Sequence, residues 1–411
     1  MKKETSVSFD EAIDRSLKLV STKPPHEWVS IFEALGRTLA RNITCKKNLP
    51  SYNNAAMDGF AIKHEDAGKT LNIKATILAG DVIEACLGKN ECYKIMTGAK
   101  VPLDADTIIP FEDCLFYDDR QSQIPLHVKR GNAFRFKGEE QEVGSQLFSA
   151  GEVLNARGIA LLASQGIAHI EVYKQLHIAV FSTGDELKKP WEEASEDEIY
   201  DVNALSLIAL LTEHGFKAHY GGVIPDNLDE AKRYLSEMKR YDAIVTSGGV
   251  SMGEADFVEK ALVENGFEAS FHGINIKPGK PTMMGKMGET IVASMPGNPL
   301  AAFVNALLFL VPVLKKLQGQ KFFNFDYINA INKVTFKVKA GRVNIVLGEL
   351  KNGEFKVYGE NKYGSGMIAP LVNSTAILIT DDATSLIREG DNIKILPMLT
   401  IFSQEKASFK N

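Results

Sequence analysis

Cysteine is scarce in this sequence of 411 residues, and the cysteines that occur do not cluster. The four thiols belong to Cys45, Cys86, Cys92 and Cys114, and no two of them form a C-x-x-C pair. So sparse a set excludes a disulfide framework, and the lack of a Cys/His cluster with ligand spacing argues against a zinc site. Reduced thiols are typical of cytosolic proteins, so we expect a cytoplasmic protein.

A strong excess of charge is also missing, and so is a very long hydrophobic run. The chain has 47 basic and 52 acidic residues, a formal net charge of −5, which argues against a nucleic-acid binder or a polybasic membrane protein. The N-terminal stretch MKKETSVSFDEAIDRSL contains no apolar h-region, so we expect no signal peptide. The longest apolar run, LAAFVNALLFLVPVL, has about fifteen residues. Because a membrane span needs about 20, we expect this run to form a buried core helix.

Several common catalytic motifs are absent from the sequence. It contains no G-x-S-x-G, H-E-x-x-H or Walker motif, and none of its eight histidines stands in a nucleophile or metal-ligand pattern. Serine-dependent acyl transfer, zinc proteolysis and P-loop ATP hydrolysis are therefore poor candidates for its activity.

The predicted secondary structure of the first half of the chain changes from helix to strand. The first forty or so residues are expected to be helical, starting at a capping box of Ser8 and Glu11 and ending near FEALGRTLARNI. Short apolar runs such as LNIKATILAG and DTIIPFED then alternate with turn signals, which predicts a β-rich segment. This segment ends at the polar, glycine-rich sequence around residues 138–151.

The second half predicts an α/β unit followed by an all-β unit. From Leu176, strands such as LHIAVFSTG and DAIVTSGG alternate with helices such as VNALSLIALLTEHG. This alternation predicts a parallel α/β sheet, which binds ligands at the carboxyl ends of its strands. After about Phe325 only short strands recur, so we expect a small terminal β domain. The predicted fold class is a multidomain α/β protein with a β-rich insertion.

Glycines and charged residues follow the predicted strands of the α/β unit. Gly248 and Gly249, in VTSGGVSMGEAD, have no side chains, so a phosphate can approach their backbone N–H groups. The alternative is a tight turn that binds nothing. Three acids and two lysines also lie near strand ends: Glu186, Asp226, Asp256, Lys277 and Lys280. Such a set suits a Mg²⁺-bridged polyphosphate, because carboxylates hold the metal and ammonium groups hold the phosphates. The alternative is that these are solvated loop charges.

Two further stretches have both a structural and a functional interpretation. PGNP, from Pro296 to Pro299, either starts the apolar helix or forms a rigid loop that lines a pocket. In the β-rich segment, Asp58, Thr97 and Glu140 lie in predicted turns. They either complete a metal or oxyanion site or are simply turn residues.

Eight stretches, taken together and in this order, resemble a known family. They are LPSYNNAAMDGFAI, IMTGAKVPLDADTIIPFED, GEEQEVGSQLFSAGEVL, FSTGDEL, YDVNA, VTSGGVSMGEADF, IKPGKP and MPGNP. The chain is similar over nearly its whole length to the molybdopterin molybdenumtransferase family, called MoeA in bacteria and related to the C-terminal domain of gephyrin.

The resemblance implies a function and an architecture. Such an enzyme inserts molybdenum from molybdate into adenylylated molybdopterin, releases AMP and forms molybdenum cofactor, with Mg²⁺ as cofactor. It is expected to be an elongated homodimer. Residues 1–45 with 144–175 would form a dimerisation domain, 46–143 an insertion, 176–325 the α/β domain and 326–411 a terminal β domain. The active site would lie between the α/β domain of one subunit and the insertion of the other.

The resemblance also assigns roles to residues. Those expected to be catalytic are Glu186, Asp58, Thr97 and Lys277. Those expected to bind substrate are Gly248, Gly249, Ser251, Asp226, Lys280, Pro296, Pro299 and Ser365. Those expected to hold the metal are Glu186, Asp256 and Glu140. Molybdate would lie near Thr97 and basic side chains.

Two other functions remain open at this point. One is a non-catalytic scaffold that, like gephyrin, binds peptides beside its terminal domain. The other is a molybdopterin adenylyltransferase, a related α/β enzyme that would lack the β-rich insertion. For the transferase itself we also expect contact with that adenylyltransferase.

Overall fold

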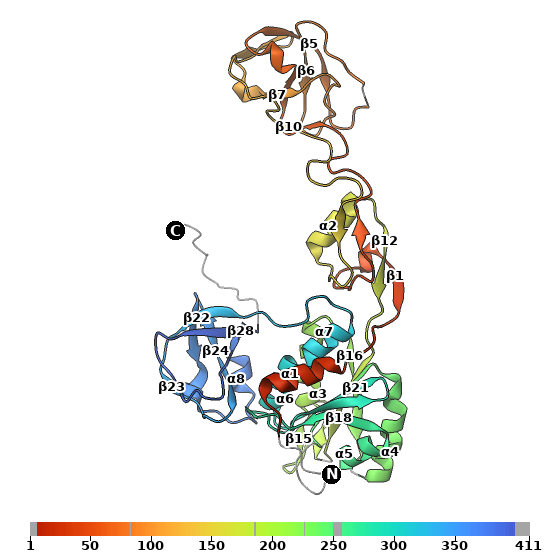
Figure 1. The fold of residues 1–411 in the computed structure, drawn as a ribbon, viewed down its shortest axis with the longest axis vertical. Helices are drawn as coiled ribbons and strands as arrows, with labels where there is room; N and C mark the ends of the chain where they lie inside the picture. The colour runs from red at the N-terminus through yellow and green to blue at the C-terminus, as the bar shows by residue number, and fades with distance from the viewer. Residues whose placement is uncertain (1–5, 83, 185, 226, 250–256, 399–411) are drawn as a thin grey trace.

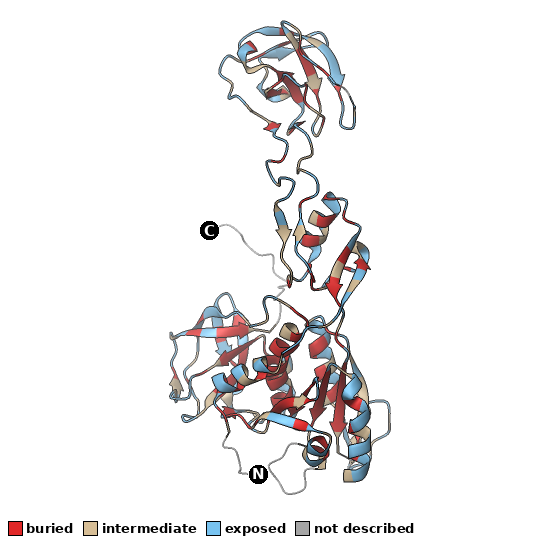
Figure 2. Ribbon diagram, turned by 45° about the vertical axis from the view of Figure 1, so that its right-hand side comes forward, coloured by how far each residue is buried: buried red, intermediate tan, exposed pale blue. Residues whose placement is uncertain are grey.

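The computed structural model describes residues 6–82, 84–184, 186–225, 227–249 and 257–398. They form an elongated molecule of four modules, with a β-rich insertion module (residues 46–143) at one end. An α/β module (residues 176–325) and a terminal module (residues 326–398) lie together at the other end, and a small central module separates them from the insertion (Figure 1). Each module has buried side chains of its own (Figure 2). The domain boundaries given above stay a prediction.

The insertion module contains a six-stranded sheet in the order β7-β4-β6-β5-β9-β8. Its strands are β4 (Gly59–Ile62), β5 (Thr70–Ile77), β6 (Glu91–Ile95), β7 (Thr107–Pro110), β8 (Phe116–Tyr117) and β9 (Gln121–Gln123). Alternate residues face two separate cores, so that Ala61 belongs to one and its neighbours Phe60 and Ile62 to the other. Burial on both faces explains why the runs that form β4 and β7 are almost entirely apolar.

The central module corrects the expectation of a helical N-terminus. Helix α1 (Phe9–Lys18) does form, and Ser8 caps it by accepting a hydrogen bond from the backbone N–H of Glu11. After α1, however, the chain turns into strand β1 (His26–Ser30), which pairs antiparallel with β12 (His169–Tyr173). Pro24 and Pro25 precede β1, and proline disfavours helix both at itself and in the residue before it. Helix α2 (Ala156–Ser164) contributes Leu162 to the core under this pair.

The chain enters and leaves the insertion through one short antiparallel pair, β2 (Ile43–Thr44) with β11 (Gln146–Phe148). Helix α1 itself does not pack in the central module. Its residues Phe9 and Ala12 lie in the main core of the α/β module, and it contacts α7 and β18 there. Helix α1 was expected to belong with residues 144–175, whereas its apolar stripe is buried against the α/β helices.

The α/β module is built on a six-stranded sheet in the order β16-β13-β17-β21-β20-β18. The expected parallel strands are β13 (Ile178–Thr183), β16 (Ala218–Ile224), β17 (Ala243–Ser247) and β21 (Thr290–Met295). At one edge, β20 (Met283–Met287) runs antiparallel to both of its neighbours, β21 and the edge strand β18 (Phe267–His272). The sheet is therefore mixed rather than fully parallel.

Helices cover both faces of this sheet (Figure 1). One core holds side chains of α3 (Asn203–Glu213), α6 (Pro299–Asn305) and α7 (Val311–Leu317), and the other holds side chains of α4 (Leu228–Ser236) and α5 (Phe257–Glu264). Between α6 and α7 lies a π-helical turn, η5 (Ala306–Leu310). The span Pro299–Leu317 is long and apolar enough to cross a membrane, but 83% of its most apolar window is buried inside the protein. Its hydrophobicity is thus explained by core packing, as the sequence analysis expected.

The terminal module is a small barrel. Its strands are β22 (Ile328–Asn332), β24 (Val343–Lys351), β25 (Glu354–Val357), β26 (Ala376–Ile379) and β28 (Asn392–Pro397). The barrel closes because β26 pairs with both β28 and β24. A two-residue strand of the α/β module, β19 (Ile276–Lys277), adds to β24 in parallel. This pairing joins the two modules next to the sequence KPGKP.

Candidate active site

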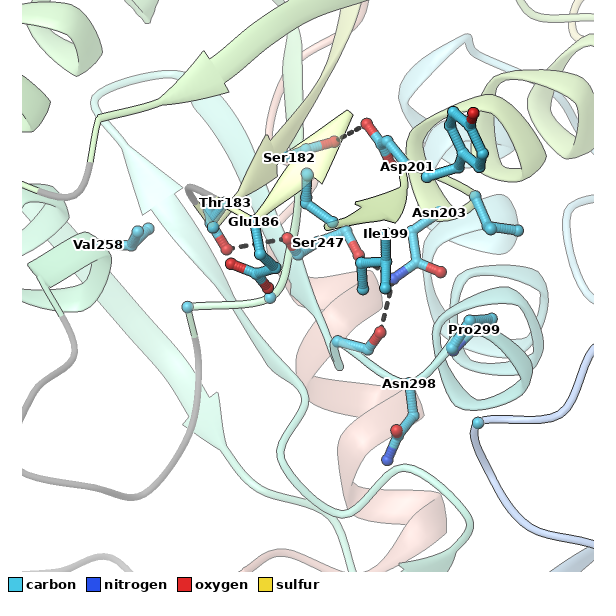
Figure 3. Close-up of a pocket in the computed structure, with 18 of the residues that line it drawn as sticks. Ser182, Thr183, Glu186, Ile199, Asp201, Asn203, Ser247, Val258, Asn298 and Pro299 are labelled. Carbon is cyan, nitrogen blue, oxygen red and sulfur yellow. Dashed lines mark hydrogen bonds between the residues drawn. The ribbon is translucent and has the colours of Figure 1, made fainter. Parts of the chain in front are cut away.

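A pocket of about 850 Å³ lies at the carboxyl ends of the parallel strands, where the α/β sheet was expected to bind a ligand. Strand β13 contributes Ser182 and Thr183, strand β17 contributes Ser247, and the loop after β21 contributes Asn298 and Pro299 (Figure 3). The pocket also includes Gly366 and Ile368 of the terminal module. Its wall is therefore shared by two modules.

Gly248 and Gly249 form the floor of this large pocket beside strand β13. Both have positive φ, 83° and 65°, which side chains rarely allow. A Cβ on Gly248 would lie 2.5 Å from Thr183 Oγ1, so only glycine fits. The backbone N–H of Gly248 already donates to the carbonyl of Met295. Of the two N–H groups, only that of Gly249 lacks an acceptor among the residues that the structure describes.

Two carboxylates among the described residues line the large pocket, and they differ in how far a ligand can reach them. Asp201 is only 5% exposed, and it accepts hydrogen bonds from the Ser182 hydroxyl and from the backbone N–H of Ala204. Glu186 is exposed and forms no ion pair within the described part of the chain. Its carboxylate folds back over Gly184, where a Cβ would lie 2.6 Å from Glu186 Oε2. Glu186 is therefore the acid that a ligand can reach.

Asn203, at the start of α3, fastens two loops of the pocket and was not singled out from the sequence. Its side-chain NH₂ donates to Ser247 Oγ at 2.7 Å and to the carbonyl of Gly297 at 2.7 Å. The end of β17 and the PGNP loop are thereby held at fixed positions. The motif YDVNA, which contains both Asp201 and Asn203, was the available signal.

A second pocket of about 370 Å³ lies beside the first, and Asn298 lines both. Three cations line it: Lys277 and Lys280 from the α/β module and Arg342 from the terminal barrel. None of the three forms an ion pair within the described residues. Ser365 lines the same pocket and accepts a hydrogen bond from the side-chain NH₂ of Asn298 at 2.9 Å. The second pocket, called the basic pocket below, is suited to an oxyanion.

The described residues supply few ligands for a metal ion. They contain no group of three or more His, Cys, Asp or Glu side chains that could hold one. Mg²⁺, however, is commonly held by one or two carboxylates together with substrate phosphates and water. Glu186 fits that donor set at the large pocket, whereas a site made by protein ligands alone does not fit the described part of the chain.

Asp58 and Thr97 form a pair of their own in the insertion module. The hydroxyl and the backbone N–H of Thr97 both donate to Asp58 Oδ1, each at 2.7 Å. These two hydrogen bonds, the hydroxyl's first, lower the pKa of Asp58 below its ordinary value, because they stabilise the charged carboxylate. A Cβ on Gly59 would lie 2.1 Å from the carbonyl oxygen of Ile109, so glycine is required directly after Asp58. The pair is therefore a defined anionic group rather than an arbitrary turn.

Replacing Thr97 with valine should raise the pKa of Asp58. Valine has nearly the same shape but lacks the hydroxyl donor, while the backbone N–H remains. The titration of the Asp58 carboxyl carbon, followed by NMR in the two proteins, measures the change. An unaltered titration would mean that the hydroxyl does not stabilise the carboxylate.

Within one chain, the predicted site residues lie in two separate regions, which are the pair of adjoining pockets and the insertion module. The large pocket takes Glu186, Gly248, Gly249 and Pro299, and the basic pocket takes Lys277, Lys280 and Ser365. Pro296 is buried and lines neither pocket. Asp58 and Thr97 lie in the six-stranded insertion, which is at the far end of the molecule (Figure 1). Glu140 lies in the stretch that joins the insertion to the central module, where its backbone N–H donates to the carbonyl of Leu49. Asp226, Ser251 and Asp256 lie outside the described residues.

Comparison with known families covers almost the whole chain. Residues 7–166 match the MoeA N-terminal region (domain I and II), residues 179–316 match a probable molybdopterin binding domain, and residues 329–398 match the MoeA C-terminal region (domain IV). The three matches follow one another in the order of the modules described above.

Individual relatives agree with this assignment. A molybdopterin molybdenumtransferase of Haemophilus influenzae is 31% identical over 398 residues, which is 95% of this chain and 98% of the relative. One of Nostoc sp. is 27% identical over 90% of this chain and 88% of its own length. Among solved structures, a molybdopterin biosynthesis MoeA protein of Pyrococcus horikoshii matches with a TM-score of 0.83 at 26% identity, covering 96% of this chain and all of that one. By sequence and by fold, this chain belongs to the molybdopterin molybdenumtransferase (MoeA) family.

Proposed function

We propose that the chain inserts molybdenum from molybdate into adenylylated molybdopterin, releasing AMP and forming molybdenum cofactor. The observation that carries this proposal is the pair of adjoining pockets, which differ in charge and share Asn298. One offers an accessible carboxylate, hydroxyl groups and a backbone N–H that has no acceptor among the described residues, and the other offers three cations. A reaction between a nucleotide-linked dithiolene and a free oxyanion needs two such places next to each other.

The large pocket suits the adenylylated pterin. Its volume of about 850 Å³ is in the range of sites that hold substantial organic ligands. The N–H of Gly249 can face a phosphate, while Pro299, Ile199 and Ile368 offer apolar surface to a ring. Glu186 would hold Mg²⁺ on the pyrophosphate, and the bound ion would neutralise negative charge there and polarise the bond that releases AMP.

The basic pocket suits molybdate. A tetrahedral dianion is stabilised by the ammonium groups of Lys277 and Lys280 and by the guanidinium of Arg342. The hydroxyl of Ser365 can donate to an oxygen of the same anion, because its own oxygen accepts from Asn298. These residues orient the oxyanion at the edge of the large pocket, where sulfur ligands would replace its oxygens. This placement differs from the expectation that molybdate lies near Thr97.

A homodimer would bring the insertion module to the site. In one chain Asp58 and Thr97 are remote from both pockets, so a role for them at the site needs a second copy. The central module exposes Trp28, Phe32 and Leu35, with exposed fractions of 67%, 95% and 66%. Such neighbouring apolar side chains support an interface between copies. A cytoplasmic location and contact with the molybdopterin adenylyltransferase are part of the same proposal.

The other two functions are less well supported. An adenylyltransferase would consist of the α/β module, whereas relatives named molybdopterin molybdenumtransferase align with nearly the entire chain. A purely structural scaffold gives no reason why Glu186 and the three cations around one pocket have no ion-pair partner among the described residues.

Incubation of the chain with adenylylated molybdopterin, molybdate and Mg²⁺ tests the proposal. We expect AMP release and molybdenum cofactor formation to rise together, and omission of molybdate should prevent cofactor formation. AMP analysis by chromatography and reconstitution of a molybdenum-free apoenzyme measure the two products. Absence of both products with a folded chain would refute the proposed activity.

A further inference from the structure

Asn305 is a polar residue placed in the most apolar part of the protein. It ends α6 within the span Pro299–Leu317, and it is completely buried. Burial of an amide is unfavourable unless the amide is hydrogen-bonded. A hydrophobic residue would suit this helix better by composition, so the contacts of Asn305 need an explanation.

The Asn305 amide fastens the loop that carries the two lysines of the basic pocket. Its NH₂ group donates to the carbonyl oxygen of Gly279 at 2.8 Å and to Thr282 Oγ1 at 2.5 Å. The Thr282 hydroxyl donates in turn to the same Gly279 carbonyl at 3.0 Å, and Thr282 is also completely buried. Asn305 therefore fixes the loop of residues 277–281 by hydrogen bonds, although Asn305 does not itself line the basic pocket.

The loop is shaped to fit this amide. Gly279 has φ of +96°, and a Cβ added there would lie 2.2 Å from Asn305 Nδ2. Only glycine allows the backbone to come so close. The two lysines of KPGKP, Lys277 and Lys280, lie on either side of Pro278 and Gly279, and both line the basic pocket. The π-helical turn η5 starts directly after Asn305. Single π-helical turns are rare and often occur at functional sites.

We propose that Asn305 is the positioning residue of the basic pocket, setting Lys277 and Lys280 for an oxyanion. This inference rests on the proposed function, because it takes molybdate as the anion. Asn305 acts through the loop and does not touch substrate. Its loss should weaken molybdate binding and leave nucleotide binding at the large pocket unchanged.

The test compares Asn305→Leu with a matched control, Asn332→Leu. Asn332 is also completely buried, and its NH₂ donates to two carbonyls, those of Val334 and Arg388, at 2.8 and 2.7 Å. The oxygen Oδ1 of each of these two asparagines has no hydrogen-bond partner. Asn332 lies in the terminal barrel and lines no part of the basic pocket. The two substitutions thus remove the same kind of contact in different places.

Calorimetric titration of the full chain with molybdate and, separately, with AMP gives the result. We expect Asn305→Leu to weaken molybdate binding about tenfold, to leave AMP binding within about twofold, and to raise the KM for molybdate more than it changes kcat. Asn332→Leu should alter none of these. If Asn305→Leu does not unfold cooperatively and so is not properly folded, Asn305→Thr is tested in its place. The threonine hydroxyl lies nearer the backbone than the asparagine amide and cannot reach the carbonyl of Gly279.

Three outcomes would overturn the inference. Unchanged molybdate affinity in the folded Asn305 variant would refute it while leaving the proposed function intact. Equal weakening by both leucine variants would show a general loss of stability instead of positioning. If the unaltered chain binds AMP but no molybdate, the placement of the oxyanion in the proposed function fails and the inference fails with it.

Discussion

Replacement of Glu186 with glutamine should lower AMP release at least about a hundredfold, the loss typical when a preorganised charge-stabilising group is removed. Glutamine keeps the shape of the side chain but removes the charge that would hold a cation on the pyrophosphate. Glu186 is the accessible acid among the described residues that line the large pocket, since Asp201 is buried and already accepts two hydrogen bonds. No other described side chain of that pocket can take over its role.

The measurement is AMP released per enzyme from adenylylated molybdopterin with saturating molybdate and Mg²⁺. The matched control is Glu213→Gln, an exposed glutamate of the same module that lines a separate small pocket. Both variants should unfold at the temperature of the unaltered chain, because neither glutamate forms an ion pair with a described residue. Full turnover by Glu186→Gln would remove Glu186 from the mechanism.

The parts of the large pocket that are local in sequence could be predicted. Gly248 and Gly249 follow a strongly apolar strand, and a glycine pair at a strand end predicts a turn at the carboxyl edge of an α/β sheet. The same reasoning located Glu186 after β13 and Pro299 at the start of α6. In each case the strand end and the site residue lie within a few positions of each other along the chain.

The contacts that complete the site depend on distant residues and could not be predicted in this way. Asn203 binds Gly297, and Asn298 binds Ser365, across separations of 94 and 67 residues. Arg342 reaches the basic pocket because β19 pairs with β24 of the terminal barrel. Amphipathic pattern and turn chemistry report on neighbours along the chain, and they contain no information about which module packs against which.

The predicted secondary structure was wrong at β1, and the predicted sheet was wrong at one edge of the α/β module. Residues 26–33 were included in the helical segment expected over the first forty or so residues. Strand β1 forms instead, since Pro24 and Pro25 interrupt the helix and β12 supplies a pairing partner far away in sequence, as in the pair Val29 with Ile170. The antiparallel edge of the α/β sheet was likewise missed, because the direction in which β18 and β20 pair is set by the tertiary arrangement.

The largest expected effect for the assembly is restoration of activity by mixing two inactive proteins. Asp58→Ala and Glu186→Gln should each be inactive alone if the site combines the α/β module of one subunit with the insertion of its partner. Random reassociation of equal amounts should give about a quarter of normal activity, because half of the dimers are mixed and each mixed dimer has one intact site. Both residues are exposed, so neither change should disturb folding.

The control for this restoration is a mixture of Glu186→Gln with Lys277→Ala. Both residues lie in the α/β module, so every site in every mixed dimer carries one of the two defects and no activity should return. AMP release after partial unfolding and refolding of each mixture, with light scattering to show that dimers have formed, gives the comparison. If Asp58→Ala with Glu186→Gln also stays inactive while dimers form, Asp58 does not act at the partner's pocket. The Asp58–Thr97 pair would then have a role inside its own module, because in one chain it lies at the opposite end of the molecule from Glu186.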